Sequence, residues 1–357
     1  MLTYVHIPFC SKKCPYCHFF VLKEEEKQKD QLLEALLQEW NERKAPVKTL
    51  YFGGGTPTLM GADRLKILIN AVNPDPSCEI TIEANPEQLT EKLATEFAAI
   101  GINRISIGLQ SLNDSELKIL GRTHSAEEAK KAVHNAYNAG IKNITVDLMY
   151  ELPTQTLSSW ENTLDQLSEL PISHLSLYNL TIEPETAFYR KKEQLQKQVA
   201  PSEKCKQMLD LAVRKLALLG LQRYEISAFA KPGFEAVHNT GYWTGEPFIG
   251  LGPSAFSYTN GSRYRNACNF PKYLNPETRV DFREKLPYPE SIKELLAINL
   301  RLLKGVDLTQ FEKRWGKLPL ETHETLQKSS YVTTKNTTSQ LSEEGLLFYD
   351  TLASELI

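Results

Sequence analysis

The sequence predicts an α/β fold in which crossover helices join the strands of a parallel sheet, followed by a smaller, mostly helical domain. The first observation is a regular alternation, up to about residue 230, of short β-rich runs with runs of helical period. The second is that candidate ligand-binding residues stand just beyond the ends of the β-rich runs, which favours a barrel or partial barrel over a doubly wound sheet. The third is length, because 357 residues fit a barrel of about 250 residues plus a small appendix.

The alternation opens with β-rich runs at 2–8 and 47–53, on either side of a stretch, roughly 24–43, whose leucines recur at helical spacing. These leucines are Leu32, Leu33, Leu36 and Leu37. Later strands are expected at 79–84, 103–109, 143–149, 174–180 and 224–229. The helices between them are expected at 61–72, 90–100, 125–139, 157–169 and 202–219. Because a helix separates each strand from the next, the strands are expected to be parallel.

Three regions follow from this pattern: a barrel over 1–230, a capping or connecting segment over 231–289, and a small C-terminal domain over 290–357. In the second region the alternation stops, and Gly, Asn, Tyr, Trp and Pro punctuate the chain, so this segment is expected to cap or flank the barrel. The third region contains a helical run at 291–303, another at 308–315 and a Ser/Thr-rich, turn-like piece at 329–340.

Composition places the protein among ordinary globular chains, with 41% hydrophobic and 24% charged residues. No apolar run reaches the roughly 18 residues of a membrane span, and the N-terminus enters a strand pattern without a signal-peptide profile. We therefore expect a cytoplasmic protein whose six cysteines are reduced. A net charge of −3 argues against nucleic acid as a partner, because phosphate binding needs a basic face.

Residues 10–17, CSKKCPYC, are the main functional clue. The three thiolates of Cys10, Cys14 and Cys17 are one too few to close a tetrahedral structural site, so a metal centre built on them keeps one position open. A zinc knuckle or a disulfide is the alternative, although zinc usually needs a second ligand pair and no such pair follows nearby. The remaining cysteines are scattered singly and are interpreted as structural. They are Cys78, Cys205 and Cys268.

The segment YVHIPFCSKKCPYC, residues 4–17, resembles the signature of the radical S-adenosylmethionine (SAM) superfamily, specifically of the oxygen-independent coproporphyrinogen III oxidase family. The resemblance covers nearly the whole chain and weakens after about residue 270. It implies a partial (β/α)6 TIM-like barrel, a 4Fe–4S cluster on the three cysteines, and SAM whose amino and carboxylate groups chelate the fourth iron. It also implies a winged-helix-like C-terminal module and, if SAM is cleaved, an electron donor of the flavodoxin or ferredoxin type.

By the same resemblance, SAM would be bound by loops that follow successive strands. The Gly-rich loop 53–57 lacks side chains where backbone must approach a ligand closely, and it lies where the family binds the SAM amino group. Glu83 would accept hydrogen bonds from SAM, and Arg122 suits the SAM carboxylate because its planar fork binds that group bidentately. The SAM-binding set expected from the resemblance is Tyr4, Tyr16, Gly54, Gly55, Thr56, Glu83, Gln110, Arg122 and Asp147. A simple turn, a solvated acid and a surface ion pair are the alternatives for the loop, Glu83 and Arg122.

Two departures from the oxidase pattern point to the paralogous heme-chaperone branch. The oxidase has a fourth cysteine where this chain has Phe19, and it carries an N-terminal arm before its first strand, whereas this chain begins at the strand. The heme-chaperone branch carries a segment of the pattern His-Asn-x-x-Tyr-Trp, present here as HNTGYW, residues 238–243. His238 is accordingly expected as an axial heme ligand, because neutral imidazole binds iron and the neighbouring rings can pack on a porphyrin. A lone histidine is more often a satisfied core or surface residue, and that alternative stays open.

Three functions follow. The first is a heme chaperone that binds a 4Fe–4S cluster, SAM and heme, and passes heme to a hemoprotein of unknown identity. The second is an oxygen-independent coproporphyrinogen III oxidase, in which a SAM-derived radical abstracts hydrogen from propionate side chains. The third is a structural zinc protein. Whether the chain is an enzyme depends on which of these holds.

Overall fold

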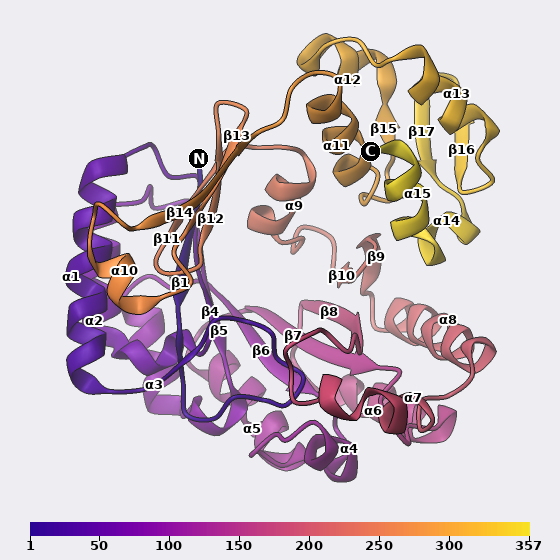
Figure 1. The fold of residues 1–357 in the computed structure, drawn as a ribbon. Coiled ribbons are helices and arrows are strands. Elements are labelled where there is room, and N and C mark those ends of the chain that lie inside the picture. Colours follow the sequence, from indigo (N-terminus) through magenta and orange to yellow (C-terminus); the bar gives the residue numbers. More distant parts are fainter.

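Six parallel strands form the centre of the fold. In the computed structural model, which describes residues 1–357, they are neighbours in space in the same order as in the sequence (Figure 1). They are β1 (Leu2–Ile7), β4 (Thr49–Gly54), β5 (Glu79–Ala84), β6 (Arg104–Gln110), β7 (Asn143–Tyr150) and β8 (His174–Asn179). Each coincides with a strand predicted from the sequence, so the predicted α/β alternation is confirmed.

Helices follow the outside of the curved sheet (Figure 1). They are α1 (Glu26–Arg43), α2 (Gly61–Val72), α3 (Glu91–Ala99), α4 (Asp114–Ile119), α5 (Ala126–Asn138), α6 (Leu157–Gln166), α7 (Lys192–Gln196) and α8 (Ser202–Leu218). In α1 the residues Leu32, Leu36 and Trp40 are at most 3% exposed, and they belong to the same apolar core as the strands. Burial of this stripe fixes the helix against the sheet.

Strand β6 shows that the two faces of the sheet differ in chemistry. Ile105, Ile107 and Leu109 belong to the apolar core shared with the helices. Arg104 and Ser106, at the alternate positions, line a pocket on the concave side. Because successive side chains of a strand point to opposite faces, this alternation collects polar groups inside the partial barrel.

The strand expected at 224–229 is a pair of short strands, and this corrects the prediction. β9 (Gln222–Glu225) and β10 (Ala228–Ala230) form a hairpin, and β10 pairs antiparallel with β8. Only two residues separate the two strands, whereas a parallel connection needs a crossover of about a dozen residues.

Residues 231–289 flank the barrel by extending its sheet at the other end. The segment contains α9 (Val237–Trp243), β11 (Phe248–Leu251), β12 (Phe256–Thr259), β13 (Ser262–Asn266), α10 (Phe270–Leu274) and β14 (Val280–Lys285). β11 pairs parallel with β1, and the next three strands follow in antiparallel order. The resulting twelve-stranded sheet ends in β14 on one side and β9 on the other, so the barrel is open.

The C-terminal domain has a separate core and a small sheet. Its elements are α11 (Glu290–Asn299), β15 (Val306–Asp307), α12 (Leu308–Trp315), α13 (Leu320–Lys328), β16 (Val332–Lys335), β17 (Thr338–Leu341), α14 (Glu343–Leu347) and α15 (Tyr349–Leu356). The Ser/Thr-rich piece expected to be turn-like forms the hairpin of β16 and β17. Threonines favour strands, and Asn336 supplies the positive φ of 54° at the turn. The Leu303 amide donates to the Tyr224 carbonyl over 3.0 Å, so this domain docks near the β9 edge.

None of the helices combines the length and the apolar character that a membrane crossing needs.

Candidate functional site

The three signature cysteines lie in one loop whose ends are held together. Short strands β2 (Phe9–Cys10) and β3 (Leu22–Lys23) pair in parallel at the base of the loop. All three thiols are free and half-buried. Burial raises the pKa of the Cys10 and Cys17 thiols. Thiolates at these positions therefore need a positive partner, which a metal centre supplies.

Two hydrogen-bonding groups face the sulfurs of this loop. The Thr56 hydroxyl lies 3.5 Å from Cys10 Sγ, and Arg122 Nη1 donates to Cys14 Sγ over 3.6 Å. The loop supplies three free thiols, one fewer than a closed structural zinc site needs. A structural zinc ion needs four ligands about 2.0–2.3 Å from one centre, whereas each iron of a cluster takes its own thiolate. The loop therefore fits a multi-iron cluster better than a zinc ion.

The Gly-rich loop packs directly under the start of the cysteine loop. A Cβ at Gly54, whose φ is 109°, would lie 2.5 Å from the His6 ring, and a Cβ at Gly55 would lie 2.6 Å from the Phe9 carbonyl oxygen. The Gly55 amide donates to Ile7 O over 2.8 Å, and the Thr56 amide donates to Phe9 O over 2.7 Å. The glycines are thus required because strand β4 ends against the chain that enters the cysteine loop.

Tyr4 and His6 continue this contact below the cysteines. Burial lowers the pKa of His6 to about 4, so its ring is neutral near pH 7. His6 Nε2 lies 3.1 Å from the Phe20 carbonyl oxygen, so Nε2 carries the proton. His6 Nδ1 therefore accepts a hydrogen bond from the Tyr4 hydroxyl, 3.1 Å away. This chain links β1 to the far end of the cysteine loop.

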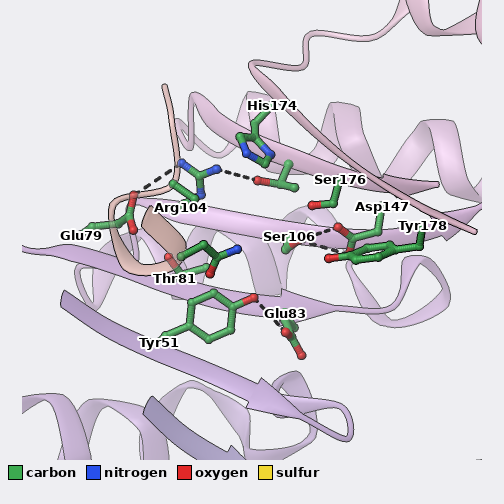
Figure 2. Close-up of a pocket in the computed structure, with 13 residues that line it drawn as sticks. Tyr51, Glu79, Thr81, Glu83, Arg104, Ser106, Asp147, His174, Ser176 and Tyr178 are labelled. Atoms are coloured by element: carbon green, nitrogen blue, oxygen red, sulfur yellow. Dashed lines mark hydrogen bonds and ion pairs between the residues drawn. The ribbon is translucent and has the colours of Figure 1, made fainter. Parts of the chain in front are cut away.

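A polar pocket opens on the concave side of the sheet (Figure 2). It encloses about 370 Å³ of space between atoms, part of it open to solvent, and residues of β4 to β8 line it. Glu83 accepts hydrogen bonds from the Tyr51 hydroxyl at 2.8 Å and the Gly54 amide at 3.0 Å. Asp147 accepts from the Ser106 hydroxyl at 3.1 Å. Burial raises the pKa of Glu83 to about 7 and that of Asp147 to about 6. Two carboxylates with raised pKa in one pocket favour a ligand that brings positive charge.

The lining of this pocket also includes two fully buried residues, Arg104 and His174, that were not predicted from the sequence. Arg104 bonds to the Glu79 carboxylate at 3.4 Å and to the Thr145 hydroxyl at 3.0 Å, and it is 2% exposed. His174 Nε2 lies 2.9 Å from the Tyr224 hydroxyl, and burial lowers the pKa of His174 well below its ordinary value. The sequence pattern that indicates such residues is the alternation of polar and apolar side chains along a strand, as in Arg104-Ile-Ser-Ile and His174-Leu-Ser-Leu.

The remaining SAM-set residues lie around the cysteine loop. Arg122 also donates to the Gly108 carbonyl oxygen over 3.0 Å, at the end of β6. Gln110 ends the same strand with a φ of 67°, and its amide nitrogen lies close to Gly108. The Tyr16 ring lies 6.2 Å from the ring of Phe188, and burial raises the pKa of Tyr16.

His238 lies apart from the cysteine loop, in the interior behind Tyr51. It is 1% exposed, with Nδ1 2.7 Å from the Thr49 hydroxyl and Nε2 2.8 Å from the Tyr242 hydroxyl. Burial lowers the pKa of His238 to about 3, so the ring is neutral. Both ring nitrogens are therefore occupied, and heme ligation would require one of these internal hydrogen bonds to break. These surroundings are those of a satisfied core histidine, the alternative named for His238, and heme ligation by His238 stays a prediction.

Comparison with known proteins adds to this geometry. The model of the Radical SAM superfamily matches residues 4–167. The heme chaperone HemW of Lactococcus lactis subsp. lactis is 34% identical over 321 residues, which cover 88% of this chain and 84% of that protein. The heme chaperone HemW of Escherichia coli is 33% identical over 373 residues, which cover 98% of this chain and 96% of that protein.

One solved structure has the same fold over nearly the whole chain. The radical SAM enzyme coproporphyrinogen III oxidase (HemN) from Escherichia coli superposes with a TM-score of 0.86, covering 99% of this chain and 89% of that chain. Its sequence identity is 23%, so this likeness concerns the fold alone. The partial-barrel architecture predicted from the sequence agrees with it.

Proposed function

This chain belongs to the radical SAM superfamily and, within it, to the HemW heme chaperone family, and we propose that it is a heme chaperone. In this proposal it binds a 4Fe–4S cluster, SAM and heme, and passes heme to an acceptor hemoprotein. The relatives support the heme part, because similarity at 33–34% identity extends over 88–98% of the chain. The site supports the cofactor part.

The observation that carries the cofactor assignment is the arrangement of the cysteine loop. Cys10, Cys14 and Cys17 would each hold one iron, and the fourth iron would be left for SAM. Thr56 and Arg122 face two of the three sulfurs, so hydrogen-bonding groups already stand beside the cysteine loop where thiolate charge would develop. When bound, such a cluster supplies a low-potential electron.

SAM would lie between the cysteine loop and the polar pocket. Gln110, at the end of β6, and Arg122, which donates to Gly108 of the same strand, suit the carboxylate of the methionine moiety. Glu83 and Asp147 suit its positive charge and its ribose hydroxyls, because both are half-buried carboxylates in the pocket wall with raised pKa. Gly54 would bring backbone close to the ligand from the side of β4. Tyr4, Tyr16, Gly55 and Thr56 complete the proposed set.

Heme is assigned to a surface outside the polar pocket. Glu79, Glu83, Asp147 and Arg104 line that pocket with ionisable groups, which suit a flat apolar macrocycle poorly. His238 is not free to bind iron in this conformation, so another side chain is expected to be the axial ligand. The acceptor would be a hemoprotein, and if SAM is cleaved, a small redox protein would supply the electron.

One experiment separates this function from the oxidase function. The protein is reconstituted with iron and sulfide without oxygen, and one sample is divided between a heme titration and incubation with coproporphyrinogen III, SAM and a reductant. A chaperone binds heme saturably and forms no protoporphyrinogen IX. Conversion of coproporphyrinogen III would make the chain an oxidase, and a sample that assembles no iron–sulfur cluster would overturn the cofactor assignment.

A further inference from the structure

Three residues from three different loops form a hydrogen-bonded chain between two of the signature cysteines. Thr56 follows β4, Asn85 follows β5, and Arg122 follows α4. The Asn85 amide nitrogen donates to Thr56 Oγ1 over 3.0 Å, and Arg122 Nη2 donates to Asn85 Oδ1 over 2.7 Å. The outer members reach the sulfurs, with Thr56 Oγ1 3.5 Å from Cys10 and Arg122 Nη1 3.6 Å from Cys14.

Asn85 has a fixed direction in each of its two bonds in this chain. A guanidinium only donates, so the oxygen of the Asn85 amide must face Arg122. Its nitrogen then faces Thr56 and donates, which occupies one of the two acceptor positions of the Thr56 oxygen. A thiolate at Cys10 can only accept, so with Cys10 bound to iron the hydroxyl proton of Thr56 points at its sulfur. On the other side, holding one amino group of Arg122 turns the second toward Cys14.

We propose that Asn85 is a positioning residue for the iron–sulfur cluster, acting through Thr56 and Arg122 on the sulfurs of Cys10 and Cys14. This inference rests on the proposed cluster, which the three cysteines would hold. Hydrogen bonds to cluster sulfurs stabilise the added negative charge of the reduced state, so they raise the reduction potential. Asn85 makes no hydrogen bond to a cysteine itself, but it joins Thr56 and Arg122, which do.

The substitution Asn85→Leu tests this, because leucine has similar size and no charge and removes both ends of the chain. Asn103→Leu is the matched control. Asn103 also joins two partners, accepting from the Ile80 amide at 2.9 Å and donating to the Cys78 carbonyl oxygen at 2.8 Å. It lies at the opposite end of the same strand pair, so it should affect folding and leave the cluster unchanged.

The readouts are thermal stability of the protein without cluster, iron and sulfide content, and the reduction potential from an EPR-monitored titration of the reconstituted protein. We expect Asn85→Leu to shift the reduction equilibrium about tenfold toward the oxidised state, roughly 59 mV for a one-electron couple, and Asn103→Leu to leave it unchanged. Loss of iron from Asn85→Leu, with iron retained in Asn103→Leu, would also support the inference. Asn85 is not an iron ligand, so it could affect iron content only through the residues that it positions.

Thr56→Val keeps the inference testable if Asn85→Leu fails to fold. This variant retains the backbone bond from Thr56 to Phe9 and removes only the hydroxyl. It should lower the potential by itself, and in its background Asn85→Leu should have a smaller effect than in the unmodified protein. Full cluster content with unchanged reduction potentials in both single variants would overturn this inference and leave the proposed function standing. An unmodified protein that assembles no cluster would overturn the proposed function as well.

Discussion

The ring of His238 is tied to strand β4 by a hydrogen bond between its Nδ1 and the Thr49 hydroxyl, 2.7 Å apart. Its other nitrogen is 2.8 Å from the Tyr242 hydroxyl, so the HNTGYW segment is joined to the barrel from within. Because these two hydrogen bonds hold the ring inside the protein, variants of this segment are expected to lower the stability of the fold and to leave the heme spectrum unchanged.

We therefore expect His238→Ala to destabilise the fold by about 2–4 kcal/mol, because it leaves a cavity and two buried hydroxyls without partners. Urea unfolding measures this. Tyr242→Phe, which removes one hydrogen bond and keeps the ring, should cost about 1 kcal/mol. The heme spectrum of both variants should match that of the unmodified protein. A shifted or absent Soret band in His238→Ala alone would restore His238 as the axial ligand.

Replacing Cys10, Cys14 or Cys17 with alanine should abolish the cluster, because two thiolates do not hold it stably. Iron and sulfide content after anaerobic reconstitution measures this. Cys268→Ala is the control, since Cys268 is exposed, lies outside the cysteine loop and donates a hydrogen bond to the Ser254 hydroxyl at 3.4 Å. Loss of cluster from the Cys268 variant would mean that the ligand set has been misassigned.

Arg122→Ala should weaken SAM binding by about 1.5–3 kcal/mol, or roughly 10- to 150-fold, because a charge-assisted contact is lost. Iron content should stay the same, since no iron ligand is removed. Calorimetric titration of the cluster-loaded protein with SAM gives the affinity. An unchanged SAM affinity would assign Arg122 to the support of Cys14, Asn85 and Gly108 alone.

Glu83 should make stability fall as pH rises, in protein without ligands. Burial raises the pKa of Glu83 from 4.5 to about 7, so between these values the folded state holds a proton that the unfolded state has released. The stabilisation is complete below pH 4.5 and is lost through pH 7. Glu83→Gln removes this loss, so its advantage over the unmodified protein should grow by about 1–3 kcal/mol between pH 5 and pH 8.

Denaturant unfolding at the two pH values checks this, with the exposed Glu355→Gln as control. An advantage of Glu83→Gln that is the same at both pH values would show that its carboxyl group does not titrate in this window.

The sequence predicted most of the barrel because its strands and helices repeat with clear periods. It did not predict β12 and β13, since residues such as Tyr258, Arg263 and Tyr264 lie on short strands without an apolar face. For the site, the cysteine motif and the Gly-rich loop were visible because chemistry demands those residue types at those spacings.

Residues that act through a partner were not visible in the same way. Asn85 and His238 owe their roles to Thr56 and Thr49, which are 29 and 189 positions away in the chain. Neither spacing nor composition indicates such pairs. Arg104 and His174 showed only an alternation that many half-buried strands share.

The proposed function depends most on a cluster in the cysteine loop that keeps one iron open. The measurement that tests this is the EPR spectrum of the reconstituted, reduced protein, recorded with and without SAM on a sample of known iron content. We expect about four irons per chain and the signal of a reduced 4Fe–4S cluster whose g-values change when SAM is added. A signal that SAM leaves unchanged, or a protein that binds one zinc ion and no iron, would contradict the account.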